Sequence, residues 1–189
     1  MFMRWLFVFL ICFAFTHSLA AMPEPPSDEL RELLRKAIVS TDSFSDRFEG
    51  EVWLTDMSSR LEKVVSDPDE RIKLLKLVHY EAHRADLPPE LVLAVIQVES
   101  YFDRWAISVA GAQGLMQIMP FWLDEIGRPE DNLFHVETNV RMGCTILKHY
   151  LDLEKGDLTR ALGRYNGSVG RFKYPNKVFD ALRTRWYRQ

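Results

Sequence analysis

Residues 91–100, LVLAVIQVES, place apolar side chains at nearly every position before the run ends at Glu99 and Ser100. A helix that is apolar nearly all round is typical of the buried centre of a domain. The β-branched residues in this run also suit a buried strand, but Pro-Pro-Glu at 88–90 favours a helix start, where proline is tolerated. The stretch therefore predicts a central, buried helix that ends in a glutamate.

The position of Glu99 suggests a chemical role for its carboxyl group. Burial disfavours the ionised form of a carboxyl group, and the negative end of the helix dipole acts in the same direction. A carboxyl group that keeps its proton near neutral pH can serve as a general acid, as glycoside cleavage requires. On this helix alone, a glutamate that simply reaches solvent at a helix end remains the alternative.

The rest of the chain also reads as helical. Apolar spacing, capping residues and breakers predict further helices, with neither an internal repeat nor an alternating strand pattern. The fold class is therefore all-α or nearly all-α. The expected helices cover residues 28–39, 52–65, 69–86, 121–127, 136–153, 158–165 and 174–188.

Composition limits the class of protein. The chain has 189 residues, of which 47% are hydrophobic and 27% charged, as expected for an ordinary globular domain. Its formal net charge of -3 argues against nucleic-acid binding, which needs a basic surface.

The first twenty residues form a separate segment. Arg4 precedes an apolar run at 5–15, and Ser18-Leu19-Ala20 follows it, which predicts a secretory signal cleaved after Ala20. The run is too short for a comfortable membrane span, although an uncleaved anchor is the alternative. Export would leave Cys144 as the one remaining cysteine, so no internal disulfide is expected, and its apolar neighbours indicate a buried thiol.

Residues 99–120, ESYFDRWAISVAGAQGLMQIMP, closely resemble the signature of the soluble lytic transglycosylases, which cleave peptidoglycan and are related to goose-type lysozyme. ALGRYNGSVG at 161–170 resembles the second motif of that family, and residues 139–151 resemble the intervening helix. Family members often have proline in place of Arg104 and a small residue in place of Gly163-Arg164.

The resemblance implies a lysozyme-like helical domain with a substrate cleft at 71–189, preceded by a linker and helical extension at 21–70 and the signal at 1–20. It implies cleavage of the bond between N-acetylmuramic acid and N-acetylglucosamine with formation of a 1,6-anhydro end, without cofactor or metal. The expected location is the periplasm of a Gram-negative bacterium, with peptidoglycan glycan strands as the partner and no membrane span after processing.

The resemblance also assigns roles to single residues. Glu99 is the catalytic acid and then the base, and Tyr165 matches a tyrosine whose hydroxyl lies near it. Gly111 and Gly114 are expected to allow positive φ or close backbone approach. The expected substrate-binding residues are Ser100, Ser108, Gln117, Met119, Tyr165 and Asn166.

Several alternatives stay open at this stage. A hydrolase would need a second carboxylate, for which Asp103, Asp124 and Glu125 are the candidates. A glycan-binding module without activity and a dedicated role in an envelope-spanning secretion or pilus machine are two further possibilities.

Two other sets of side chains have residue types that can bind metals or sugars. His79 and His83 have metal-ligand spacing, but Tyr80 stands where a zinc protease needs glutamate, so we interpret both as surface histidines and expect no metal. Three tryptophans are candidates for stacking on sugars, although core packing is the commoner use: Trp53, Trp105 and Trp122.

Overall fold

The computed structural model describes residue 44 and residues 46–187 of the chain. The expected signal at 1–20 and the expected helix at 28–39 lie outside the described residues. Within the described part the protein is helical, and its only β-type pairing is two isolated bridges in the 107–118 loop. The all-α prediction is confirmed.

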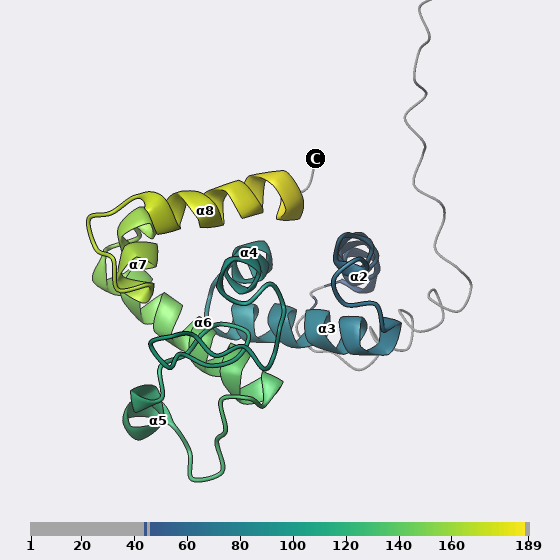
Figure 1. Ribbon diagram of the computed structural model, residues 1–189. Helices are drawn as coiled ribbons and strands as arrows, with labels where there is room; N and C mark the ends of the chain where they lie inside the picture. Colours follow the sequence, from purple (N-terminus) through teal and green to yellow (C-terminus); the bar gives the residue numbers. More distant parts are fainter. Residues whose placement is uncertain (1–43, 45, 188–189) are drawn as a thin grey trace, which may run out of the picture.

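The helices follow the predicted order (Figure 1). The last predicted helix, 174–188, is instead a shorter α-helix, α8, that continues into one π-helical turn, η1. The bounds are α2 Arg47–Leu61, α3 Pro68–Arg84, α4 Pro89–Glu99, α5 Phe121–Ile126, α6 Val136–Leu153, α7 Leu158–Tyr165, α8 Lys173–Ala181 and η1 Leu182–Trp186.

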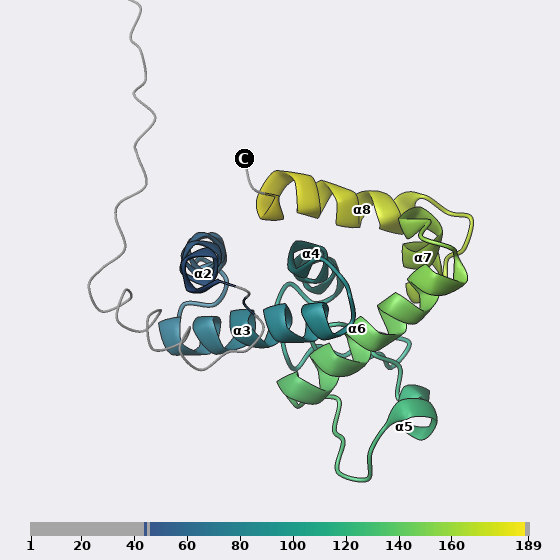
Figure 2. The same ribbon diagram turned by 180° about the vertical axis from the view of Figure 1, so that it is seen from behind.

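Helix α4 lies at the centre of the molecule, with α3, α8 and η1 packed against it (Figures 1 and 2). Its residues from Val92 to Ile96 have no exposed surface. Pro88 and Pro89 open the helix as predicted, because neither has an N–H group that a first turn would leave unpaired. The apolar run therefore forms the central helix and carries Glu99 at its last position.

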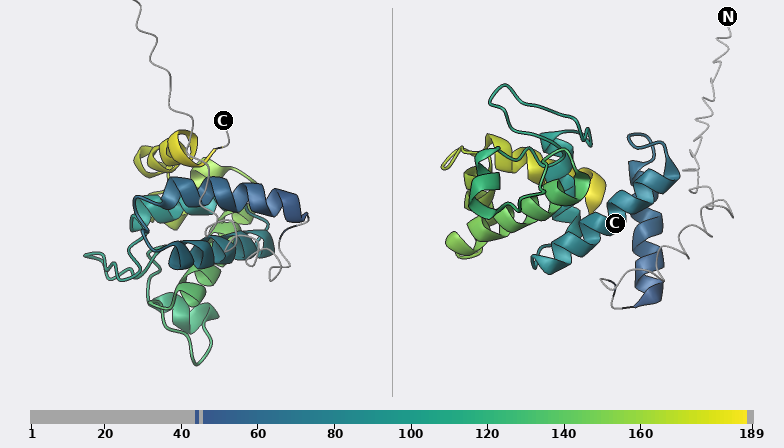
Figure 3. Two further views of the ribbon diagram at one scale, coloured as in Figure 1. Left: turned by 90° about the vertical axis from the view of Figure 1, so that its right-hand side faces the viewer. Right: turned by 90° about the horizontal axis from the view of Figure 1, so that it is seen from below.

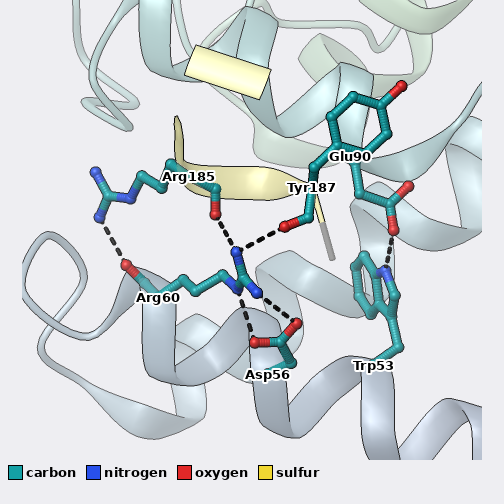
Figure 4. Close-up of polar contacts among 6 residues, drawn as sticks. All are labelled: Trp53, Asp56, Arg60, Glu90, Arg185 and Tyr187. Atoms are coloured by element: carbon teal, nitrogen blue, oxygen red, sulfur yellow. Dashed lines mark hydrogen bonds and ion pairs between the residues drawn. The ribbon is translucent and has the colours of Figure 1, made fainter. Parts of the chain in front are cut away.

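Helix α2 covers one side of this core and begins five residues before the predicted start at residue 52. Asp46 explains the earlier start, because its carboxylate accepts hydrogen bonds from the backbone N–H groups of Phe48 and Glu49. The buried face has helical spacing, and the Trp53 indole donates to Glu90 on α4 at 2.7 Å (Figure 4). The extension is thus packed onto the core.

The C-terminal end of the described chain lies near α2 (Figure 3). Arg60, near the end of α2, connects the two (Figure 4). Its guanidinium pairs with Asp56 at 2.7 Å and donates to the carbonyls of Arg185 at 2.6 Å and Tyr187 at 3.0 Å. In return, the Arg185 guanidinium donates to the Arg60 carbonyl at 2.7 Å. This reciprocal contact holds η1 against α2.

We expect Arg60→Ala to lower the free energy of unfolding by about 2 kcal/mol, because a partly buried carbonyl, an exposed carbonyl and a carboxylate lose their donor. Urea denaturation measures the change. Arg47→Ala, an exposed position at the other end of α2, serves as the control and should change stability by less than about 0.5 kcal/mol. Equal effects of the two substitutions would contradict the role of the contact.

Candidate active site

The chain turns sharply directly after Glu99, at the end of α4. Tyr101 and Phe102 have φ of 52° and 69°, in the left-handed region that non-glycine residues rarely adopt. Phe102 is buried and packs on the Trp186 ring at a centroid distance of 5.7 Å, while the Trp186 indole donates to Gln97 at 2.8 Å. Packing against η1 thus holds the strained turn that follows the glutamate.

The carboxyl group of Glu99 has unusual acidity. Burial raises its pKa from 4.5 to about 7, and two smaller influences oppose this increase: a hydrogen bond from Tyr174 and the nearby charge of Lys177. The Tyr174 hydroxyl donates to Glu99 Oε1 at 2.6 Å. Near neutral pH both the acid and the carboxylate form of Glu99 are therefore populated. A group that first donates and then accepts a proton needs both forms.

The tyrosine that hydrogen-bonds Glu99 is Tyr174, on α8, a residue that no motif in the sequence indicated. The Tyr165 hydroxyl instead donates to the Met116 carbonyl at 2.8 Å, although its high pKa reflects burial and the proximity of Glu99. Tyr165 thus lies close to the glutamate but binds the loop. The substrate-binding role of Tyr165 stays a prediction.

The raised pKa of Glu99 also predicts a dependence of stability on pH. The folded protein holds this proton more tightly than the unfolded chain, so the stability it contributes is complete below pH 4.5 and is lost as pH rises through about 7. We expect Glu99→Gln, which cannot ionise, to be more stable than the parent by about 2–3 kcal/mol at about pH 8.5 and nearly equal at about pH 4. Urea unfolding at both pH values measures this; a difference independent of pH would contradict it.

The loop between α4 and α5 contains two glycines with unusual backbone conformations. Gly111 and Gly114 have φ of 87° and 75°, which confirms the expected positive φ. At Gly114 a Cβ would lie 2.6 Å from the Leu133 carbonyl oxygen and would also collide with Asn139. Both positive φ and close approach therefore require glycine at residue 114.

Asn139, buried on α6, fastens this loop. Its amide group donates to the carbonyls of Gln113 and Leu133, both at 2.8 Å, and its carbonyl accepts from the Met116 backbone N–H at 2.8 Å. One side chain thus satisfies three backbone groups of the loop and of the segment before α6.

Two expected substrate-binding residues hold the loop together and keep part of their hydrogen-bonding capacity. The Ser108 hydroxyl accepts from the Ala112 N–H at 3.0 Å and retains its own proton for donation. The Gln117 amide donates to the carbonyls of Ala106 and Gly114, which leaves its oxygen as an acceptor.

The other three expected residues are in different settings. Ser100 donates to the Leu115 carbonyl at 2.8 Å and so links α4 to the loop. Met119 is half-buried, and Asn166 is exposed at the end of α7, where its side chain accepts from Ser168 at 3.1 Å. None of these contacts tests their expected roles with substrate.

The two histidines of α3 differ in burial, although both were predicted to lie on the surface. His79 is buried, with 5% of its surface exposed, and stacks on Phe44 at a centroid distance of 3.8 Å, so its interpretation as a surface residue is wrong. Burial lowers the pKa of His79 to about 4, whereas His83 is exposed as predicted. In the described part of the chain no three His, Cys, Asp or Glu side chains are grouped as metal ligands.

The tryptophans and the cysteine divide between core and surface. Trp53 is buried, Trp122 is half-buried, and Trp105 is 63% exposed beside Phe134. Cys144 is buried as expected. Over residues 46–187, no helix combines the length and apolar character needed to cross a membrane.

Comparisons with known proteins identify relatives of this chain. Residues 76–184 match the model of the transglycosylase SLT domain. A transglycosylase of Enterobacteria phage PRD1 is 34% identical over 51% of the chain, which corresponds to 38% of the phage protein. Membrane-bound lytic murein transglycosylase C of Yersinia pestis is 31% identical over 52% of the chain and 32% of its own length. The chain thus spans about a third of the length of these relatives.

Solved structures include similar proteins at lower identity. An inactive mutant of the lytic transglycosylase Slt from Pseudomonas aeruginosa aligns with a TM-score of 0.47 and 21% identity over 71% of this chain and 25% of that one. The 70 kDa soluble lytic transglycosylase of Escherichia coli aligns with a TM-score of 0.42 and 18% identity over 80% of this chain and 29% of that one.

Proposed function

Because the chain belongs to the transglycosylase SLT domain family, we propose that it is a peptidoglycan lytic transglycosylase. It cleaves the β-1,4 bond between N-acetylmuramic acid and N-acetylglucosamine and leaves a 1,6-anhydro end. The observation that carries the proposal is Glu99, a partly buried carboxyl group with a pKa of about 7 at the end of the central helix.

In the first step, protonated Glu99 donates its proton to the oxygen between the two sugars. The bond from that oxygen to C1 of the muramic acid residue breaks, and the 2-acetamido group of the same sugar stabilises the cationic centre. Tyr174 favours the carboxylate that forms, because its hydroxyl donates to Oε1.

In the second step, the Glu99 carboxylate takes the proton of the 6-hydroxyl group while O6 forms a bond to C1. The sugar closes into its 1,6-anhydro form and Glu99 is protonated again, so no water is consumed. One carboxyl group serves both steps, whereas most glycosidases need two.

The surroundings of Glu99 favour this route over a two-carboxylate hydrolase. Among the described residues, the groups that influence its pKa are Tyr174 and Lys177, neither of which is a carboxylate. The candidate Asp103 accepts from the backbone N–H of Trp105 in its own loop, and Asp124 and Glu125 are exposed on α5.

Mass spectrometry of peptidoglycan digested by the purified protein tests the proposal. We expect products that end in 1,6-anhydromuramic acid. Reducing ends would identify a hydrolase instead, and the absence of products together with retained glycan binding would identify a non-catalytic module.

Tyr174→Phe should move the basic limb of the pH–rate profile to higher pH. The hydrogen bond from Tyr174 lowers the pKa of Glu99, so its removal raises that pKa further and keeps the acid form populated at higher pH. The pH dependence of product release measures the shift. Tyr80→Phe, on an exposed part of α3, is the matched control. An unchanged profile in Tyr174→Phe would contradict the role of the hydrogen bond.

We also infer that the protein acts in the periplasm of a Gram-negative bacterium. The apolar segment 5–15 and the small residues after it support export, and the proposed substrate lies outside the cytoplasm. Fractionation of cells that express the full chain tests this location.

A partnership with a secretion or pilus machine stays a prediction. The surface available for it is the outer side of α2, which precedes the family-matching residues and exposes Phe48 and Val52. Co-purification with intact envelope complexes tests that surface, by comparing the parent protein with Phe48→Glu.

A further inference from the structure

We propose that a second pocket, separate from the Glu99 site, binds the free amino-acid end of a peptide: an aliphatic chain carrying both an ammonium and a carboxylate group. The pocket is a cavity of about 430 Å³ between the first turns of α3 and α6 and the loop after α4. This volume is within the usual range of small-molecule sites. This inference rests on the proposed function, because the stem peptides of peptidoglycan would supply the ligand: the free end of their diamino acid.

The floor of the pocket is apolar. Leu74 and Leu77 on α3, Phe102 after α4, Leu115 in the loop and Val136 on α6 all line it. Leu74, Phe102 and Leu115 belong to the buried core, so the floor is a fixed surface. An aliphatic chain of several methylene groups would lose water contact on this floor, which favours binding by about 0.8 kcal/mol per buried methylene.

Carboxylates on the rim provide a site for the ammonium group. Asp69 and Glu70 in the first turn of α3 and Glu137 in the first turn of α6 line the same cavity. None of these three carboxylates makes an ion pair in the part of the chain that the structure describes. Asp67 also lines the cavity, as does one further cation, Lys73. Four carboxylates facing the two cations Lys73 and Arg104 leave an excess of negative charge, which favours an ammonium group.

Arg104 provides the partner for the carboxylate group. It lines the cavity, donates to the Phe134 carbonyl at 3.3 Å and lies over the Trp105 ring at 4.7 Å. Its Nε is buried without a hydrogen-bond partner, the one such side-chain atom among the described residues. The guanidinium is only half-buried and makes one hydrogen bond of its own, so its other N–H donors can form a charge-assisted hydrogen bond with a ligand carboxylate.

The pocket and the catalytic site share one segment of backbone. The side chain of Leu115 lines the pocket, while its carbonyl accepts from Ser100, next to Glu99. The carbonyl of the next residue, Met116, accepts from Tyr165. A peptide held in the pocket would therefore contact Leu115, whose carbonyl is hydrogen-bonded next to Glu99, whereas Glu99 itself does not line the pocket.

Binding of three small molecules to the purified full chain tests the proposal: meso-diaminopimelate, cadaverine, which lacks the carboxylates, and pimelate, which lacks the ammonium groups. NMR titration gives each Kd. We expect diaminopimelate to bind at least about tenfold more tightly than either of the others, because each of those loses one charged contact. Equal affinity for diaminopimelate and cadaverine, or no binding of any of them, would overturn the proposal.

Substitutions in the pocket test which residues bind the carboxylate end and the ammonium end of the ligand. Arg104→Gln should weaken diaminopimelate binding about tenfold and leave cadaverine unchanged, whereas Glu137→Gln should weaken both. Glu130→Gln, an exposed carboxylate outside the pocket, is the matched control and should change neither. Unchanged diaminopimelate binding in both pocket variants would refute the site. Because these titrations need no glycan cleavage, their outcome is independent of whether anhydro products form.

Discussion

Glu99→Gln is expected to lower the rate of anhydro-product formation by at least about 10³-fold while glycan binding is retained, because the amide can neither donate the acid proton nor accept the second one. The substitution preserves the shape of the side chain and can still accept a hydrogen bond from Tyr174. Product formation is measured by mass spectrometry and binding by sedimentation with insoluble peptidoglycan.

The matched control for that experiment is Glu125→Gln. Glu125 is an exposed carboxylate on α5 that had been a candidate for a second acidic group. We expect near-parental turnover for it. Residual activity of Glu99→Gln close to that of the parent, or a comparable loss in Glu125→Gln, would contradict the single-carboxylate scheme.

Asn139→Ala is expected to lower the free energy of unfolding by about 4 kcal/mol. The substitution leaves two buried backbone groups without partners, the Leu133 carbonyl and the Met116 N–H, at about 1–3 kcal/mol for each. It also removes one of the two hydrogen bonds to the Gln113 carbonyl, which keeps its bond from the Ile118 N–H. Urea denaturation followed by circular dichroism measures the loss.

Two further variants complete this experiment: one is a control at an exposed site, and the other separates the donor and acceptor roles of the Asn139 side chain. Asn176→Ala, at an exposed position on α8, should change stability by less than about 0.5 kcal/mol. Asn139→Asp keeps the acceptor and loses both donors, so it should also be strongly destabilising. Stability of Asn139→Ala within about 1 kcal/mol of the parent would show that the loop does not depend on this side chain.

The helices with strong local signals could be predicted from the sequence. Helix α6 has the predicted bounds, 136–153, because its apolar spacing is regular and Gly156 lies just beyond its end. Helix α2 was predicted to cover 52–65 but covers 47–61. The helix starts after Asp46, which caps it. Asp46 lies in the polar stretch 40–50, which contains several other residues that could cap a helix, so the sequence does not single it out.

The buried position of Glu99 could be predicted because its own helix defines its surroundings, whereas its hydrogen-bond partner could not. Tyr174 is 75 residues further along the chain, and only the packing of α8 on α4 brings it to Glu99. The burial of His79 escaped prediction for the same reason, since it depends on Phe44 and Trp53 from the segment before α3. Contacts between distant segments leave no periodic signal in the sequence.

The reciprocal contact of Arg60 with the end of η1 means that the segment shared with relatives takes part of its packing from residues outside it. A fragment trimmed to residues 76–184 would lose Trp186 beneath Phe102 and would uncover the apolar faces that α2 protects. The strained turn that sets the direction of Glu99 would then lose its support. Shortened forms of this chain should therefore keep α2 and η1, which cover the core, rather than end where the similarity to relatives ends.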